Sequence, residues 1–290
     1  MLRQLIRALR PLQWAKNILV FAPLAFDLKL FDPFYLSRTV LAFLALSALA
    51  SSVYLLNDLA DIEKDRLHPT KRNRPLASGQ LPIPVAVITL LILAAAGLLT
   101  SWWLGVWVFA LGLFYIIKNL AYSYYLKRIV IIDVMLLALN YLIRVGVGVV
   151  VVEVERFSPW LYVCVGLGAL FIGLGKRRHE LVLMQRSGDN TRDVLNHYTL
   201  PFIDLMMAVV ATSTITAYAF YTFSDAPTLP TNHIAMLTIP IVIYGIFRYL
   251  YLIHVRGQGG APDELVFEDR PLFATVVIWG LAMVALLYFF

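Results

Sequence analysis

Long apolar runs dominate the chain, and polar residues gather in the segments between them. A helix rises about 1.5 Å per residue, so runs of about 17 to 25 apolar residues cross the roughly 30 Å of hydrocarbon in a bilayer. The pattern predicts an all-α polytopic membrane protein, with residues 1–290 forming a single integral-membrane domain. The nine predicted spans are 13–31, 37–56, 82–104, 106–126, 129–152, 159–176, 201–223, 233–253 and 272–290.

Composition supports the membrane interpretation. Hydrophobic residues make up 60% of the chain and charged residues 14%, with a mean hydropathy of +0.77. These values are far too apolar for a soluble domain of this length. The one cysteine, Cys164, lies in an apolar run, which excludes an internal disulfide framework and a cysteine-based zinc site.

Basic residues are distributed unevenly between the two sides of the predicted helices. Most of the 24 Lys and Arg residues precede the first span or lie at every second connection. Because cytoplasmic segments carry the excess of Lys and Arg, the N-terminus is predicted inside and the C-terminus outside. This topology accounts for the net charge of +6 without a nucleic-acid partner. It places the protein in the inner (plasma) membrane as a multi-pass protein.

Three long polar connections, 57–81, 176–200 and 254–271, share the predicted cytoplasmic side. The connections on the opposite side are short and poor in charge. Long loops on a rigid scaffold commonly carry function, so the active site is expected to face the cytoplasm.

Acidic residues cluster where the second span ends. If its helix continues past Leu56, Asp58, Asp61 and Asp65 are spaced by three and seven residues and lie on one face. Clustered carboxylates repel one another unless a cation compensates them. Their hard oxygen atoms suit Mg²⁺, which typically takes one or two carboxylates together with substrate phosphate oxygens. Asp58, Asp61 and Asp65 are therefore the predicted metal ligands.

Three basic residues, Lys71, Arg72 and Arg74, follow the carboxylates within the same connection. Acids and bases interleaved in this way indicate a site that binds a metal ion and an anion together. The alternative is a solvated acidic face followed by bases that anchor the chain at the membrane surface.

The fifth predicted span contains a polar stripe. Asp133, Asn140 and Arg144 recur with Leu137 at helical spacing, so they share one face. Ionisable groups inside a span cost at least about 2.5–3.5 kcal/mol each in lipid, which makes them candidates for function. The alternative is an internal network that only holds helices together.

A third polar group begins where the sixth span ends. Lys176 and Glu180 stand one helical turn apart there, with Arg177 between them. A surface ion pair between Lys176 and Glu180 is the structural interpretation of this spacing.

Several of these segments resemble one known family. Residues 57–65, Asn-Asp-x-x-Asp-x-x-x-Asp, resemble the first aspartate-rich motif of the UbiA superfamily of intramembrane prenyltransferases. Residues 68–75, His-Pro-Thr-Lys-Arg-x-Arg-Pro, resemble its decaprenyl-phosphate phosphoribosyltransferase branch. The segments 122–127, Tyr-Ser-x-x-Leu-Lys, and 175–181, Gly-Lys-Arg-x-x-Glu-Leu, are similar to the same branch. Similar pieces extend from residue 11 to residue 279.

The resemblance implies a nine-helix protein that uses Mg²⁺. Its implied reaction transfers 5-phosphoribosyl from phosphoribosyl diphosphate to a decaprenyl-type polyprenyl phosphate, with release of pyrophosphate, for cell-envelope arabinan precursors. Homo-oligomers are possible. The catalytic candidates are Asp58, Asp61, Asp65, Lys176 and Glu180. The candidates for substrate binding are Lys16, Asn57, Lys71, Arg72, Arg74, Tyr122, Lys127, Asp133, Arg144, Arg177, Arg192 and Tyr198.

The segment 175–181 departs from the superfamily pattern, which has a second set of aspartates at this place. Fewer acids and more bases favour a substrate that brings additional phosphate charge. Asp189 and Asp193 imitate the missing motif but lie well past the span, so Glu180 is preferred.

Two other functions remain open. One is a polyprenyltransferase acting on an aromatic acceptor, as in quinone or haem synthesis, which shares the first motif. The other is a transporter of anionic solutes, whose site is expected near the bilayer midplane. The concentration of charge on one side of this chain argues against transport.

Overall fold

The computed structural model describes most of the chain as two compact helical units, and each is presented by itself. The residues described are 1–67, 71–155, 158–187, 193–224, 228–230, 232–258, 265–266 and 268–290. The first unit comprises 1–24, 29–124 and 143–153, and the second comprises 25–28, 125–142 and 154–290. All regular secondary structure in the described residues is helical, which confirms the predicted class.

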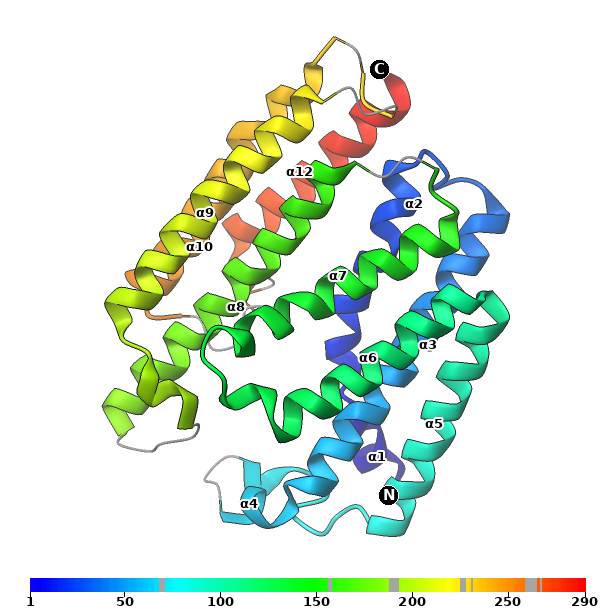
Figure 1. Ribbon diagram of the computed structural model, residues 1–290, viewed down its shortest axis with the longest axis vertical. Coiled ribbons are helices and arrows are strands. Elements are labelled where there is room, and N and C mark those ends of the chain that lie inside the picture. The colour runs from blue at the N-terminus through cyan, green and yellow to red at the C-terminus, as the bar shows by residue number, and fades with distance from the viewer. Residues whose placement is uncertain are drawn as a thin grey trace. The chain divides into compact units, whose positions relative to one another are not determined.

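The first unit is built around its longest helix, α3. Its elements are α1 (Leu2–Leu9), η1 (Pro11–Phe21), α3 (Pro33–Ala60), α4 (Ile62–Leu67), η2 (Lys71–Asn73), α5 (Ile83–Leu104) and α6 (Val106–Tyr124). Helix α3 packs along α5 and also contacts α6, α1 and η1 (Figure 1). Leu49 and Leu55 of α3 are fully buried, so the core of this unit lies on α3.

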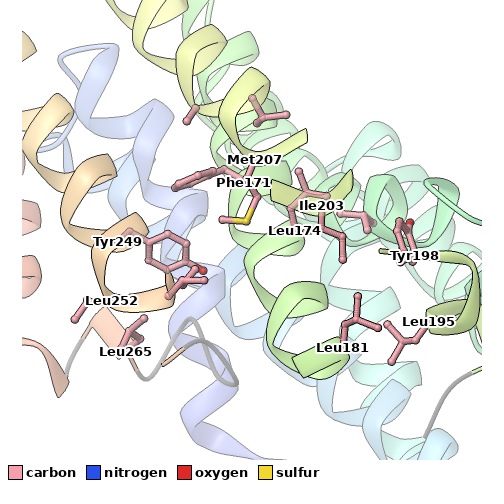
Figure 2. Packing of buried hydrophobic residues seen from close by; sticks show 14 of the residues in the cluster. Phe171, Leu174, Leu181, Leu195, Tyr198, Ile203, Met207, Tyr249, Leu252 and Leu265 are labelled. Atoms are coloured by element: carbon pink, nitrogen blue, oxygen red, sulfur yellow. The ribbon is translucent and has the colours of Figure 1, made fainter. Parts of the chain in front are cut away.

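The second unit gathers the C-terminal half of the chain. Its elements are η3 (Leu126–Arg128), α8 (Pro159–Ser187), η4 (Asp193–His197), α9 (Leu200–Phe223), η5 (Ile234–Thr238), α10 (Ile239–His254) and α12 (Arg270–Phe289). Figure 2 shows apolar side chains of α8, α9 and α10 packed together in its core. The rings of Phe171 and Tyr249 lie 5.2 Å apart between their centres.

Two further helices are divided between the units. Helix α7 (Ile132–Val152) places its first residues in the second unit and residues 143–152 in the first. The short helix α2 (Ala22–Phe26) is divided after Leu24.

Local sequence signals explain where the long helices begin and end. Asp32 caps α3 by accepting a hydrogen bond from the backbone N–H of Phe34 at 2.8 Å, and Pro33 occupies the first turn. Gly105 ends α5 with φ of 147°, a conformation that side-chain-bearing residues rarely adopt. These signals set α3 and α5 as separate long helices.

Eight helices among the described residues are long and apolar enough to cross a membrane. They correspond to the second through ninth predicted spans. Residues 11–26 differ, because they form the 3₁₀ helix η1 and then α2. Pro23 has no N–H and stands in the first turn of α2, where proline starts a new helix. The first predicted span, 13–31, therefore stays a prediction.

Helix α8 also extends beyond the sequence prediction. Its span was expected to end near residue 176, but the helix continues to Ser187. Lys176, Arg177 and Glu180 thus stand on a regular helix, in agreement with the one-turn spacing used in the sequence analysis. Their relative directions follow helical geometry, which places residues three or four apart on the same face.

Gly148 of α7 shows how closely η1 packs within the first unit. A Cβ at this position would meet the carbonyl oxygen of Val20, and it would lie 2.9 Å from Cγ of Pro23. Gly148→Ala is therefore expected to lower the free energy of unfolding by about 1–3 kcal/mol. Denaturant titration of the purified protein in micelles measures this change.

Gly168→Ala is the matched control for Gly148. A Cβ at Gly168, on α8, would have no heavy atom within 4 Å. Alanine is the better helix former, so this change is expected to be neutral or to stabilise by up to about 1 kcal/mol. Equal decreases in the free energy of unfolding of Gly148→Ala and Gly168→Ala would contradict the close packing of η1 against α7.

Candidate active site

The acidic residues of the first motif lie on two successive helices. Asp58 stands on the last turn of α3, the chain turns at Asp61, and Asp65 lies in α4. Asp61 has φ of −102° and ψ of 11°, outside the helical region. The continuous helix considered from the sequence is therefore interrupted at Asp61, and the three carboxylates do not share one helical face.

Arg74 brings two of the three carboxylates together. Its Nη1 donates to Oδ2 of Asp65 at 2.6 Å and to Oδ1 of Asp58 at 3.1 Å. Arg10 adds a second guanidinium, whose Nη2 donates to the same Oδ1 of Asp58 at 2.6 Å. Both carboxylates are buried, whereas the side chains of Arg10 and Arg74 are 30% and 29% exposed. Two acids and two bases therefore balance one another here, and these four residues are called the carboxylate cluster.

The carboxylate cluster has the donor chemistry of a magnesium site, although no set of three ligands is assembled. The described part of the chain contains no group of three or more His, Cys, Asp or Glu side chains placed to hold a metal ion. Asp58, Asp61 and Asp65 are thus not gathered into one such group among the described residues, and their role as metal ligands stays a prediction. Asp58 and Asp65 nevertheless offer hard oxygen atoms, which Arg74 holds together while Arg10 also pairs with Asp58. This pair fits Mg²⁺, which often takes only one or two carboxylates from the protein.

Asn57 is tied to the neighbouring helix α6. The hydroxyl of Ser123 lies 2.8 Å from Oδ1 of Asn57 and 2.9 Å from the carbonyl oxygen of Asn119. Tyr122, half-buried, precedes Ser123 on α6. Residues 122–124, at the start of the 122–127 segment, therefore lie beside the first motif within the first unit.

Arg144 belongs to a buried polar network in the first unit. Its Nε donates to Oδ1 of Asn17 at 2.7 Å, and Nδ2 of Asn17 donates to Oγ of Ser47 at 2.9 Å. The guanidinium also lies over the ring of Tyr115, 5.7 Å from its centre. These contacts join α7, η1 and α3, as the helix-holding alternative requires. The predicted role of Arg144 in binding substrate stays a prediction.

The remaining predicted anion-binding residues have different surroundings. Lys16 and Lys71 are half-buried, and Arg72 is exposed. Lys127, in η3 of the second unit, is half-buried. Arg192 lies outside the described residues.

The second unit contains a buried chain of hydrogen bonds centred on Arg177. Its Nε donates to Oδ2 of Asp133 at 2.6 Å, and its Nη1 donates to Oε2 of Glu180. Tyr198 donates to Oδ1 of Asp133 at 2.8 Å and accepts from the backbone N–H of Ile131 at 2.7 Å. The side chains of Arg177 and Asp133 have no exposed surface, whereas Glu180 is 19% exposed. These residues are called the Arg177 network.

Charge and burial explain why the Arg177 network holds one arrangement. Burial raises the pKa of Tyr198, so its hydroxyl remains a hydrogen-bond donor to Asp133 at neutral pH. A buried guanidinium requires compensating acceptors, and Asp133 and Glu180 supply them. Arg177 thus fixes the direction of Glu180, which is the one partly exposed carboxylate among these residues. Lys176, half-buried, stands one turn before Glu180 on α8.

Arg10 and Ser123 contact residues of the first motif, and neither was identified from the sequence as a site residue. Arg10 was interpreted only as one of the basic residues that set topology. No spacing rule joins it to Asp58, which is 48 residues away. Ser123 lay inside the recognised 122–127 segment, which was the available signal.

Known proteins resemble this chain over most of its length. A model of the UbiA prenyltransferase family matches residues 18–261. The chain is 34% identical over 98% of its length to the decaprenyl-phosphate phosphoribosyltransferase of Mycolicibacterium smegmatis, of which it covers 92%. It is 34% identical, over 98% of its length and 86% of the relative, to the protein of the same name from Corynebacterium glutamicum.

The fold has a close counterpart among solved structures. A UbiA homolog from Archaeoglobus fulgidus, solved bound to GPP and Mg²⁺, superposes with a TM-score of 0.73 at 18% sequence identity. The superposition covers 97% of this chain and 99% of the other. At this identity the likeness shows a shared fold.

Proposed function

Because the chain belongs to the UbiA prenyltransferase family, we propose that it transfers 5-phosphoribosyl from phosphoribosyl diphosphate to a polyprenyl phosphate. The observation that carries the proposal is the 34% identity to relatives named for this chemistry, which extends over 98% of the chain. That range includes both the carboxylate cluster and the Arg177 network. The product is a phosphoribosylated lipid, a precursor for pentose donors of the cell envelope.

In the proposed reaction, an oxygen of the lipid phosphate attacks C1 of the ribose. The new bond joins C1 to this oxygen while the bond from C1 to the diphosphate breaks, and pyrophosphate leaves with the electron pair. The lipid phosphate is already ionised at neutral pH, so no strong protein base is required. Catalysis then depends on positioning and on electrostatic stabilisation.

Asp58 and Asp65 would hold a magnesium ion, with Asp61 close by in sequence at the turn. Bound Mg²⁺ supplies positive charge that stabilises the departing pyrophosphate. Arg74 keeps Asp58 and Asp65 together, and Lys71 and Arg72 contribute positive charge on the following segment.

In this proposal, residues of the second unit bind a phosphate group and orient the substrate. Lys176 contacts a phosphate group of the ribose or of the lipid, and Glu180 orients a ribose hydroxyl or Lys176. Arg177 acts through Glu180 and is a positioning residue, because its own guanidinium is buried between two carboxylates. Tyr198 and Asp133 hold Arg177 in turn.

We place the protein in the plasma membrane with nine spans, the N-terminus inside and the reaction on the cytoplasmic face. Residues 11–26 are short for a span, but a 3₁₀ helix rises about 2.0 Å per residue. With η1 of 11 residues and α2 of 5 residues, the segment extends about 30 Å, which matches the hydrocarbon thickness. Val20 and Leu24 are fully buried in it, as expected for a helix inside a bundle.

The experiment that tests the function asks which substrate keeps its phosphorus. Polyprenyl monophosphate labelled with radioactive phosphorus is incubated with purified protein, phosphoribosyl diphosphate and Mg²⁺. The label is expected in a larger, more polar lipid, because the lipid phosphate becomes the bridge to ribose. Omission of phosphoribosyl diphosphate is the control.

The aromatic alternative has the opposite outcome. A polyprenyltransferase of that kind would release the phosphorus of a polyprenyl diphosphate and alkylate an aromatic acid. If this second reaction proceeds while label never enters a ribosylated lipid, the family holds and the proposed substrates are wrong.

A further inference from the structure

Arg10 stands at the carboxylate cluster although its segment lies far away in the sequence. It follows α1 and precedes Pro11, with φ of 53° and ψ of 59°. This left-handed conformation is unfavourable for a residue with a side chain, and a following proline disfavours it further. Strain of this kind persists where the surrounding structure holds it, and it often marks functional positions.

Hydrogen bonds on both sides of Arg10 hold its backbone against α3. Ser51 donates from Oγ to the carbonyl oxygen of Leu9 at 2.9 Å, and Nε1 of Trp14 donates to Oγ of Ser51 at 3.0 Å. The guanidinium lies over the ring of Tyr54, 4.9 Å from its centre. The main chain is thus anchored on α3, while the long side chain reaches Asp58 from a fixed origin.

The contacts of Arg10 and Arg74 differ in a way that separates their roles. Arg74 bridges Asp58 and Asp65. Its backbone is held in a turn by hydrogen bonds to Lys71 and from Ser78. Within the described part of the chain, Arg10 forms an ion pair with Asp58 and none with Asp65. Release of Arg10 therefore leaves the two carboxylates gathered, whereas release of Arg74 separates them.

A divalent cation arriving at Asp58 competes with Arg10 for the same oxygen. Oδ1 of Asp58 already accepts hydrogen bonds from both guanidinium groups. A metal ion bound to Asp58 would take up that lone-pair capacity and add positive charge, which would repel the guanidinium of Arg10. A diphosphate brought with the metal offers Arg10 a new anionic partner, and guanidinium groups pair well with phosphate oxygens.

We propose that Arg10 is a substrate-binding residue that exchanges partners, from Asp58 in the empty protein to a diphosphate oxygen once metal and diphosphate are bound. The inference rests on the proposed function, because it takes its ligand from that reaction. In the protein without metal, the guanidinium of Arg10 supplies positive charge next to the Asp58 carboxylate. The N-terminal segment thereby takes a direct part in substrate binding, in addition to its role in the membrane topology.

The test measures two binding constants in the full-length protein in detergent. Mn²⁺ alone is titrated by paramagnetic resonance of the free ion, and pyrophosphate is titrated by calorimetry at saturating Mn²⁺. In Arg10→Ala the competitor for Asp58 is gone, so Mn²⁺ is expected to bind about threefold tighter or more. Pyrophosphate is expected to bind at least about tenfold more weakly, because a charge-assisted contact is lost.

Two further variants make the result specific. Arg7→Ala removes an exposed base of α1 and is expected to leave both constants within about twofold of the wild type. Arg10→Lys keeps the positive charge but loses the planar guanidinium, which can donate two parallel hydrogen bonds. It is expected to retain the wild-type Mn²⁺ constant and to weaken pyrophosphate binding by a smaller factor than Arg10→Ala. Circular dichroism of each variant checks that the helices are intact. If Arg10→Ala does not fold, Arg10→Gln carries the test, because it also removes the charge and is expected to change the two constants in the same opposite directions.

Opposite changes in the two constants support the exchange of partners. Parallel weakening of both would show a purely structural Arg10, and two unchanged constants would show no role in binding, so either result overturns the inference alone. If the wild-type protein binds neither probe, the metal and diphosphate of the proposed function fail as well.

Discussion

Replacement of Asp58 by Asn is expected to lower the turnover number by at least about 1,000-fold at limiting Mg²⁺. The change keeps the shape of the side chain but removes one of two buried carboxylates gathered by Arg74. A metal ion that stabilises a departing diphosphate contributes several kcal/mol to the barrier, and about 4 kcal/mol corresponds to this factor. Formation of the phosphoribosylated lipid under single-turnover conditions measures the loss.

Glu63→Gln is the matched control for Asp58→Asn. Glu63 lies five residues further along, is 84% exposed in its side chain and pairs only at the surface with Arg66. An exposed ion pair of this kind contributes at most about 1 kcal/mol, so turnover is expected to change less than about twofold. Full turnover of Asp58→Asn at limiting Mg²⁺ would remove Asp58 from the metal site.

Arg177→Met is expected to lower the free energy of unfolding by about 3–5 kcal/mol, the largest stability effect predicted for a single residue here. The substitution leaves the Asp133 carboxylate fully buried without its guanidinium, and uncompensated buried charges are costly. Thermal or denaturant unfolding in micelles measures the change, since the effect concerns the fold and needs no substrate.

The adjacent arginine supplies the control. Arg178 pairs with Asp204 at 2.7 Å, but this pair is partly exposed. Arg178→Met is therefore expected to cost about 1 kcal/mol or less. The double variant Arg177→Met with Asp133→Leu is expected to recover much of the lost stability, because an apolar pair of similar volume often replaces a buried ion pair at little cost. Equal losses in Arg177→Met and Arg178→Met would contradict the central position of Arg177.

The membrane helices were accessible from sequence because their signal is local. Apolar length alone identifies a span, and eight of the nine predicted spans have a helix in the structure that is long and apolar enough. The remaining one, 13–31, stays a prediction, because η1 is followed by a new helix that begins near Pro23 and the segment is not one α-helix. Helix α8 continues to Ser187, past the predicted end of its span at residue 176, because charge marks the membrane boundary and does not by itself stop a helix.

The motifs located both polar clusters, but their internal geometry could not be obtained from spacing. Asp58 and Asp65 were expected to meet on one helical face, and they meet instead through Arg74 across the turn at Asp61. Arg177 was expected to bind substrate, and it is buried between Asp133 and Glu180. In both cases the sequence identified the base, Arg74 or Arg177, as a substrate-binding candidate, but spacing could not show which acids it pairs with.

By itself, the sequence determined the membrane environment, the helical class, the family and the segments that carry the polar groups. These properties depend on apolar length and on residues close together in the chain. Only the tertiary structure decided which acid faces which base. Arg10 is 48 residues from Asp58, and Arg177 is 44 residues from Asp133. Side-chain periodicity relates residues within one helix, whereas ion pairs between helices depend on how those helices pack.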